Sequence, residues 1–391
     1  MPNSGILMVT GVYYPEVNGA ANLCRQLVNE LKKKLRFTVL TTTQNPNLPR
    51  QCKVDGIELF RIFLGKRILF KSAHLVPKLI MFFFFNRNQF QIIHMFGFSN
   101  KSIILVFLAK IFQKRVVIQL TSVGHDDHQS MRNRGFFINW FFSKADIYVG
   151  LSPRFHAIYK TVMRRKENFR LISTGIDTRR FCPVNNDEKS MLRGQLGLYG
   201  KKKWILFVGH FSREKCPNIL LDAWKRYVAD LYPDTGIIFI GSLNPNHYEV
   251  DSQLVNDIKK LADSYVDRPI IFIERTHVIE QYYQSADIFV LPSLREGMPN
   301  ALLEAMACSL SVIVSRLEGV TDWVVNDGIN GLLVKPGISD DLGRAIKKVL
   351  NDDDLAETFG LQARKTIEDR FSIHKIAEQY GGLYGDLVLS T

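Results

Sequence analysis

The stretch that decides the fold reads Ala286-Asp287-Ile288-Phe289-Val290-Leu291-Pro292 and, after Ser293 and Leu294, Arg295-Glu296-Gly297-Met298-Pro299-Asn300-Ala301-Leu302-Leu303-Glu304. Its unbroken apolar run predicts a buried strand that ends at the first proline. A glycine-bearing loop and a helix-forming run follow, which places Glu296 at the carboxyl end of a strand and aims the first helical amides at its ligand. Such amides favour anions, and carboxylates bind hydroxyls, so the stretch suits a nucleotide-sugar. A surface turn followed by an ordinary helical Glu304 fits the spacing equally well.

Strand-like and helix-like segments alternate along almost the whole chain, which predicts two doubly wound parallel α/β sheets. Helical segments between the strands include 20–34 and 101–112. The first series of expected strands is 6–10, 37–41, 57–60, 92–95, 116–120 and 147–151, and the second is 204–208, 237–240, 270–273, 288–291, 312–315 and 332–334.

The composition favours a cytoplasmic protein with two domains. The chain has 391 residues, of which 46% are hydrophobic and 23% are charged, enough for two cores and a polar surface. Its five cysteines are scattered without C-x-x-C spacing, which argues against a disulfide framework or a zinc site. No signal sequence is expected at the start, and the most apolar stretch, 75–85, is too short to span a membrane and contains Pro77 and Lys78.

The net charge of +13 is unevenly distributed. Residues 1–185 hold 28 Lys and Arg against 9 Asp and Glu, whereas residues 186–391 hold 23 against 29. The basic half also carries an aromatic run, 132–142, of the composition found in interfacial membrane segments. We therefore expect the first half to meet an anionic membrane surface, although a core helix with a basic flank fits the same run. No reader motif accompanies the charge, so nucleic acid is not an expected partner.

The spacing E-G-x-P-x-x-x-x-E of Glu296 and Glu304, before a small-residue helix, resembles the paired-glutamate signature of retaining GT-B glycosyltransferases. The family includes sucrose synthase and bacterial mannosyl- and glucosyltransferases. The resemblance implies the GT-B fold, two Rossmann-like domains facing a central cleft. It also implies that Glu296 contacts the transferred sugar, that Glu304 contacts the ribose, and that the backbone of Gly297, Met298, Pro299 and Asn300 contacts the donor.

The resemblance extends to the domain organisation. Residues 1–183 are expected to form an acceptor-binding domain and residues 184–372 a nucleotide-sugar domain, because 183–188 is polar and rich in helix breakers. The stretch 172–183 is similar to the family's N-G-V-D-x-x-x-F-x-P hinge, with Thr174 in the Asn position. Residues 373–391 are expected to form a helix that crosses back onto the first domain.

Two further loops resemble donor phosphate contacts. Gly19, in the first βα turn, matches the family's Gly-rich opening loop, while Asn18 stands where a second glycine is common. The stretch 209–217 is similar to the pattern G-R-x-x-x-x-K-G, in which Arg and Lys neutralise the donor diphosphate. Lys215 matches the lysine, and His210, a titratable and weaker ligand, replaces the arginine. Arg213 would compensate if its side chain turned inward.

His125 follows a strand in the acceptor half, in the loop 120–128. Polar residues at the carboxyl end of a parallel strand line ligand crevices, and relatives place a histidine near the transferred sugar in a comparable loop. A role in loop hydrogen bonding, or a metal site with Asp126, Asp127 and His128, stays open. A cofactor or metal is not required in this family, and the D-x-D stretch 352–354 is expected to be a loop with a helix cap.

The sequence thus resembles that of a retaining hexosyltransferase, an enzyme that moves a sugar from a nucleotide-sugar to a glycan or lipid-linked acceptor. The expected setting is the cytoplasmic face of a membrane, in polysaccharide or glycoconjugate synthesis, with His125 and Glu296 as catalytic residues. A GT-B epimerase, a phosphorylase and a non-catalytic sugar-binding module remain alternatives.

Overall fold

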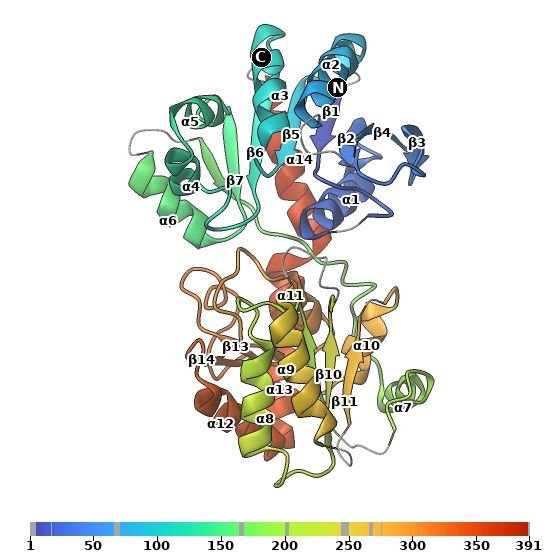
Figure 1. The fold of residues 1–391 in the computed structure, drawn as a ribbon, viewed down its shortest axis with the longest axis vertical. Helices are drawn as coiled ribbons and strands as arrows, with labels where there is room; N and C mark the ends of the chain where they lie inside the picture. Colours follow the sequence, from blue (N-terminus) through green and yellow to red (C-terminus); the bar gives the residue numbers. More distant parts are fainter. Residues whose placement is uncertain are drawn as a thin grey trace. The chain divides into compact units, whose positions relative to one another are not determined.

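The computed structural model describes residues 5–16, 18–65, 71–163, 168–199, 203–243, 250–265, 269–274 and 276–389. The chain divides into two compact units, one formed by residues 1–175 and 373–391 and the other by residues 176–372. Each unit is a parallel α/β sheet covered by helices, as the alternation of segments predicts (Figure 1).

The sheet of the first unit has the strand order β3-β4-β2-β1-β5-β6-β7-β8. Neighbours pair in parallel except β3 and β4, which form an antiparallel hairpin. All six strands predicted for this half are confirmed, and β3 and β8 were not predicted. The strands are β1 (Ile6–Val9), β2 (Phe37–Thr43), β3 (Gln51–Val54), β4 (Ile57–Phe63), β5 (Ile92–Phe96), β6 (Arg115–Leu120), β7 (Ile147–Gly150) and β8 (Phe169–Leu171).

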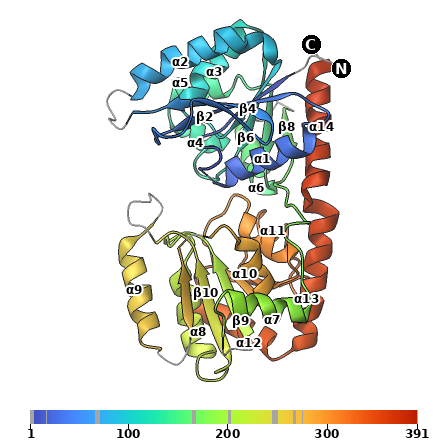
Figure 2. The same ribbon diagram turned by 90° about the vertical axis from the view of Figure 1, so that its right-hand side faces the viewer.

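Helices cover both faces of this sheet. On one face α1 packs against α14, and on the other α2 and α5 each pack against α3 (Figure 2). This division follows from right-handed crossovers that leave β1 toward β2 and, later, β5 toward β6 in the opposite direction. The helices are α1 (Gly19–Leu31), α2 (Lys71–Asn86), α3 (Asn100–Ile111), α4 (His128–Asn133), α5 (Phe136–Phe142), α6 (Pro153–Val162) and α14 (Ile373–Leu389), with a 3₁₀ turn at Arg87–Gln89.

Buried polar contacts join α14 to the first sheet. Tyr384 and the Nδ1 atom of His94 on β5 are hydrogen-bonded at 2.7 Å, and Tyr380 donates to the side-chain oxygen of Gln119 on β6. Complete burial lowers the pKa of His94 to about 3, so this imidazole is neutral at physiological pH. The terminal helix is therefore part of the first unit.

The sheet of the second unit is entirely parallel, with the order β11-β10-β9-β12-β13-β14. All six strands predicted here are confirmed: β9 (Lys203–Val208), β10 (Thr235–Ile240), β11 (Ile270–Ile273), β12 (Ile288–Leu291), β13 (Ser311–Ser315) and β14 (Leu332–Val334). The helices are α7 (Asn186–Gln195), α8 (Pro217–Tyr227), α9 (Ser252–Asp263), α10 (Ile279–Ser285), α11 (Asn300–Ala307), α12 (Ser339–Leu350) and α13 (Asp353–Thr366), with a π turn at Ile367–Phe371.

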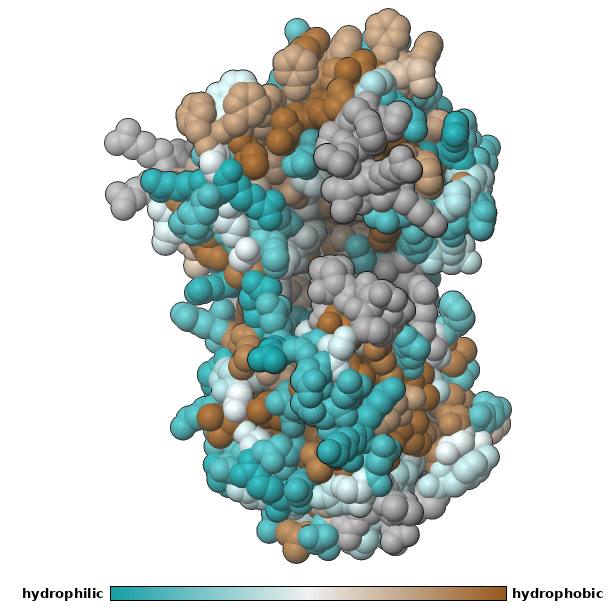
Figure 3. Space-filling model, viewed as in Figure 1, coloured by the Kyte–Doolittle hydropathy of each residue, from teal (hydrophilic) through white to brown (hydrophobic). Residues whose placement is uncertain are grey.

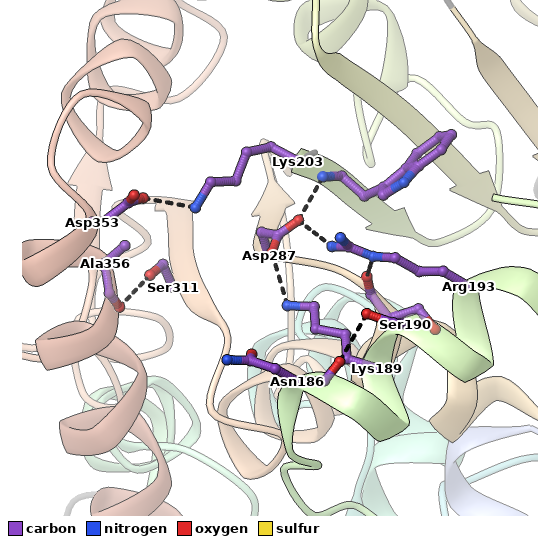
Figure 4. Close-up of polar contacts among 11 residues, drawn as sticks. Asn186, Lys189, Ser190, Arg193, Lys203, Asp287, Ser311, Asp353 and Ala356 are labelled. Carbon is purple, nitrogen blue, oxygen red and sulfur yellow. Dashed lines mark hydrogen bonds and ion pairs between the residues drawn. The ribbon is translucent and has the colours of Figure 1, made fainter. Parts of the chain in front are cut away.

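Asp287, just before β12, connects α7 to this sheet (Figure 4). Its carboxylate accepts from the Lys189 ammonium at 2.8 Å and from the Arg193 guanidinium at 2.6 Å. It also accepts from the backbone N–H of Trp204 at 2.7 Å, at the start of the central strand. One carboxylate thus holds two half-buried cations and one strand end.

The division between the units falls after residue 175, rather than after residue 183 as the polar stretch suggested. The intervening residues pack within the second unit because Phe181 is buried edge-on against Tyr283, with ring centroids 5.9 Å apart. Arg364 also donates to the Phe181 carbonyl at 2.7 Å. The returning chain runs beside this segment, where the N–H of Ile176 donates to the Phe371 carbonyl at 2.9 Å.

Candidate active site

The second sheet places two predicted site residues at its topological switch point. From β9 the chain first moves to β10 and β11 on one side and then returns to β12 on the other. Loops at the carboxyl ends of the two strands where the order reverses flank the ligand crevice of such sheets. Lys215 lies in the loop after β9 and Glu296 in the loop after β12.

Lys215 and Glu296 form a close ion pair at this point. The Lys215 ammonium lies 2.6 Å from Oε1 and 2.7 Å from Oε2 of Glu296. The Glu296 side chain is 6% exposed, and that of Lys215 is 25% exposed. The structure therefore brings together the predicted diphosphate ligand and the predicted sugar ligand, in a setting where charge interactions are screened less than at the surface.

Two further contacts join the same loops. The N–H of Leu294 donates to the Glu214 carbonyl at 2.7 Å, and the Glu214 carboxylate forms an ion pair with Arg295 at 2.6 Å. Residues 294–296 of the loop after β12 are thus all bonded to the loop after β9. Such cross-links restrict the motion of Lys215 and Glu296 and preorganise the pair for a ligand.

The backbone around Lys215 has two special positions. Cys216, where the family pattern ends in glycine, adopts a left-handed conformation with φ +53°, and its thiol donates to the Arg213 carbonyl at 2.9 Å. A side chain in this region costs about 1–2 kcal/mol relative to glycine. At Gly241 a Cβ atom would lie 1.8 Å from the Gly209 carbonyl oxygen, so only glycine allows the loops after β9 and β10 to approach this closely.

Arg213 does not compensate for the replacement of arginine by His210. Its guanidinium bonds to Asp251 at 2.7 Å, and its side chain is 83% exposed. The condition for compensation, that this side chain turns inward, is not met, because Asp251, the residue that caps α9, holds it at the surface. His210 and Lys215 both lie in the loop between β9 and α8.

The helix that follows Glu296 is α11, whose first residue is Asn300. Pro299 takes the cap position in an extended conformation, and Met298 is buried. The loop from Gly297 to Asn300 therefore leads into the amino terminus of the helix, where backbone N–H groups and the helix dipole favour an anion.

Glu304 occupies the second turn of α11 and is half-buried. Its Oε2 accepts a hydrogen bond from the hydroxyl of Tyr283 on α10 at 2.9 Å. Burial raises its pKa from 4.5 to about 7, while the Tyr283 bond and the positive charge of Arg180 act in the opposite direction. Sequence reasoning did not single out Tyr283, because its partner lies on another helix.

In the first unit Gly19 begins α1, directly after β1 and its loop. Asn18 is the helix cap, with its side-chain oxygen accepting from the Ala21 N–H at 2.8 Å. This bond explains why asparagine can stand where a glycine is common, since asparagine is among the best capping residues.

The loop that carries His125 is held by two buried carboxylates. Asp126 accepts from the N–H and hydroxyl of Thr121 and from the N–H of Ser122, with the hydroxyl bond at 2.6 Å. Asp127 caps α4 by accepting from the Ser130 N–H at 2.9 Å. These two carboxylates hold the loop that carries His125 in place.

His128 points away from this loop into an aromatic cluster. Its ring centroid lies 4.4 Å from that of Tyr148, and burial lowers its pKa to about 4. Over the residues that the structure covers, no three His, Cys, Asp or Glu side chains are grouped so that they could hold a metal ion. As predicted, the D-x-D stretch 352–354 contains a helix cap: Asp352 caps α13 by accepting from the Leu355 N–H at 2.9 Å.

Comparisons with known proteins agree with this architecture. Residues 188–366 match the family model described as "Glycosyl transferases group 1". The chain is 29% identical over 225 residues to the UDP-Gal:alpha-D-GlcNAc-diphosphoundecaprenol alpha-1,3-galactosyltransferase of Escherichia coli, a match covering 56% of this chain and 54% of that protein. The chain thus spans about half the length of this curated relative.

Two solved structures share the fold. Sucrose-phosphate synthase from Thermosynechococcus elongatus superimposes with a TM-score of 0.81 at 22% identity, over 100% of both chains. Anabaena Alr3699/HepE, solved in complex with UDP and glucose, has a TM-score of 0.79 at 18% identity, over 98% of this chain and 100% of that one. The fold is therefore GT-B, with two Rossmann-like domains, which confirms the predicted fold class. The family model covers most of the second unit but less than half of the chain.

Proposed function

We propose that the protein is a retaining glycosyltransferase that transfers a hexose from a nucleotide-sugar to a glycan or lipid-linked acceptor. The observation that carries the proposal is the Lys215–Glu296 pair at the switch point of a group 1 glycosyltransferase domain. It combines a cation for a diphosphate with a carboxylate for sugar hydroxyls. Solved relatives of the same fold in complex with UDP and glucose, and with UDP-glucose, support a nucleotide-sugar as donor.

In this proposal Lys215 neutralises the donor diphosphate, and the sugar hydroxyls donate to Glu296. The direct bond between the two side chains keeps both at the switch point before the donor arrives, and diphosphate binding then replaces part of their mutual contact. The N–H groups from Gly297 to Asn300, at the start of α11, add to the positive field. Together they stabilise the leaving diphosphate by electrostatic preorganisation, and the proposal needs no metal ion.

Glu304 and His210 complete the proposed donor site. Glu304 is the proposed acceptor of hydrogen bonds from the ribose, and its bond to Tyr283 fixes its orientation. His210 is the proposed second diphosphate ligand. Because an imidazole loses its charge near neutral pH, it contributes less than an arginine would. Gly19 and His125 are proposed to contact the donor from the first unit, with His125 close to the transferred sugar. Transfer would occur on the front face of the sugar, with the donor phosphate helping to deprotonate the acceptor.

The first unit carries a surface suited to a membrane. The outer sides of α2, α3 and α5 expose large apolar side chains, and Figure 3 shows brown side chains gathered over α2 and α3. We call this set the apolar face: Ile80, Met81, Phe84, Phe85, Phe107, Ile111, Phe136, Phe137 and Trp140. In the described residues no helix has the length and apolar character needed to cross a bilayer.

Basic side chains accompany the aromatics of this face. The Arg87 guanidinium lies 4.3 Å from the Phe84 ring centroid, and the Lys144 ammonium lies 4.6 Å from that of Trp140. Cations beside exposed aromatic rings fit the boundary between anionic headgroups and acyl chains. We therefore propose peripheral binding to an anionic membrane on its cytoplasmic face. The name of the E. coli relative, which includes a diphosphoundecaprenol acceptor, supports a lipid-linked acceptor in glycoconjugate synthesis.

Product analysis of the full chain tests the proposed reaction. Wild-type protein and Glu296→Gln are incubated with nucleotide-sugars and a panel of lipid-linked and glycan acceptors, and products are identified by mass spectrometry and NMR. The proposal expects a new glycosidic bond with retained anomeric configuration from wild type, and at least a hundredfold lower rate from the variant. Three other results would contradict the transferase proposal. An isomerised nucleotide-sugar would indicate an epimerase, and a sugar 1-phosphate would indicate a phosphorylase. Binding without turnover would indicate a non-catalytic module.

A further inference from the structure

The first unit has a pocket of its own at the switch point of its sheet. From β1 the chain first moves to β2 and β4 and then returns to β5 on the other side. A pocket of about 240 Å³ lies where the loops after β1, β5 and β6 meet, with walls that include Gly11, the segment 96–99 and His125. Lys101 from α3 and Arg134 from the end of α4 also line it.

Lys101 is the unusual residue of this pocket. Its ammonium donates to the carbonyl of Thr10 at the end of β1, and burial lowers its pKa to about 8. Within the described ranges, no ion pair joins Lys101 or Arg134 to a carboxylate. Removing a cation from water is costly unless an opposite charge compensates for it. This cost applies to Lys101, which is half-buried, whereas Arg134 is exposed and adds a second positive charge at the edge of the same pocket. The pocket is therefore suited to an anionic ligand.

Asp126 is the carboxylate that lines the same pocket, and its oxygens already have partners. They accept from Thr121 at 2.6, 2.9 and 3.0 Å and from the Ser122 N–H at 2.8 Å. Burial also raises the pKa of Asp126, which disfavours its charged form. Asp126 thus shapes the loop after β6, where the hydrogen bonds from Thr121 and Ser122 occupy its oxygens.

We propose that this pocket binds a phosphoryl group of the acceptor, with Lys101 and Arg134 as its ligands. The proposal rests on the proposed transferase function, because it assigns the acceptor to the first unit. Guanidinium and ammonium groups together are the usual protein ligands of a tetrahedral oxyanion, and Arg134 can bind two of its oxygens at once. A soluble sugar phosphate and a lipid phosphate share this chemistry.

Thermal shift measurements with inorganic phosphate test the site in the full chain. The variants are Lys101→Met, which keeps the length of the side chain without its charge, and the matched control Lys110→Met on the same helix, which removes a surface pair with Asp146. Phosphate should raise the melting temperature of wild type and of Lys110→Met. Its affinity for Lys101→Met should fall about tenfold or more, the loss expected for one hydrogen bond to a charged group. Without phosphate, Lys101→Met should be at least as stable as wild type, which would show that the variant folds.

A Lys215→Met variant distinguishes this site from the donor site. The phosphate affinity should be unchanged in Lys215→Met and about tenfold or more weaker in Lys101→Met, whereas stabilisation by a nucleotide-sugar should show the opposite pattern. A phosphate response that disappears in Lys215→Met and persists in Lys101→Met would overturn the proposal while leaving the donor site intact, as would no response in wild type.

Two further probes identify the source of the phosphoryl group. Glucose 6-phosphate serves as the soluble probe, and phosphatidylcholine vesicles with or without phosphatidic acid serve as the lipid probe, with binding measured by thermal shift and by sedimentation. A response to either probe that requires Lys101 supports the site and identifies its source. Responses that do not depend on Lys101 contradict it.

Discussion

The ammonium of Lys215 and the carboxylate of Glu296 lie 2.6 Å apart, although 81 residues separate them in the chain. The contact exists because β9 and β12 are neighbours in the sheet, so that the loops at their carboxyl ends meet. A cation and a carboxylate are thus held together where an α/β sheet binds its ligands. Each residue depends on the other for charge compensation.

A double-mutant cycle tests this dependence. Lys215→Met and Glu296→Gln should each lower the free energy of unfolding by about 1–3 kcal/mol, because each leaves a partly buried group without its partner. The double variant should be less destabilised than the sum of the two, since no charge is then left alone. Urea unfolding of the four proteins measures the coupling, and strictly additive effects would show that the pair is not energetically linked.

Glu304 should make the stability of the protein depend on pH. Its pKa is about 7 in the folded state and about 4.5 in the unfolded chain, so between these values the folded state binds more protons. Stability therefore falls as pH rises from about 4.5 to about 7, by at most on the order of 3 kcal/mol. Glu304→Gln should remove this loss and be more stable than wild type at pH 8, as measured by urea unfolding at pH 5 and pH 8.

Two buried histidines make the free energy of unfolding rise with pH over part of the same pH range. The effect of Glu304 is therefore measured as the difference in stability between wild type and Glu304→Gln. The pKa values of His94 and His128 are lowered to about 3 and about 4, and their contribution to stability is lost as pH falls below about 6.5. Tyr283→Phe offers a second check, because loss of its bond should raise the pKa of Glu304 further. A wild-type minus Glu304→Gln difference that is flat with pH would contradict the account.

Asp287 should be far more important for stability than a surface carboxylate. Asp287→Ala leaves Lys189 and Arg193 half-buried without their common partner, for an expected loss of about 3–5 kcal/mol. Asp353→Ala is the matched control: it removes an ion pair with Lys203, but its side chain is 78% exposed, so about 0–1 kcal/mol is expected. Equal losses in thermal or urea unfolding would show that Asp287 does not have the connecting role described.

Binding to anionic vesicles should require the apolar face. The double variant Phe136→Ser/Phe137→Ser should weaken sedimentation with phosphatidylserine-containing vesicles about tenfold or more, because each fully buried phenylalanine contributes about 1.5–3 kcal/mol. Leu361→Ser, an exposed apolar residue of the second unit, should bind as wild type does. Higher salt should weaken binding by screening the basic side chains. If the double variant binds vesicles as wild type does, the proposal that the apolar face contacts the membrane is contradicted.

Sequence patterns predicted the strands well because buried parallel strands are uninterrupted apolar runs. They missed β3, which is a half-exposed edge strand, although Asp55 and Gly56, both with positive φ, form a two-residue hairpin turn that a search for Asp-Gly would have found. They also missed β8, which has three residues. Such short edge strands carry too little periodicity to be recognised.

Side-chain partners were the least predictable part of the site. Spacing suggested Lys215 and Glu296 separately, but their contact depends on strand order. Nothing local indicated that Arg213 would bond to Asp251, or that the Tyr283 hydroxyl would donate to Glu304. Lys101 was overlooked because a lysine in the first turn of a helix is usually exposed, and its burial depends on loops that are distant in the sequence.

The most direct test of the central claim, that the Lys215–Glu296 site holds a nucleotide-sugar, is the affinity of the full chain for nucleotide-sugars. A panel of UDP-, GDP- and ADP-hexoses is measured by thermal shift and calorimetry against wild type, Lys215→Met and Lys110→Met. The account predicts that at least one nucleotide-sugar binds wild type and Lys110→Met alike and binds Lys215→Met at least tenfold more weakly, as expected when a charge-assisted contact with the diphosphate is lost. Equal affinity for wild type and Lys215→Met, with both proteins folded, would contradict it.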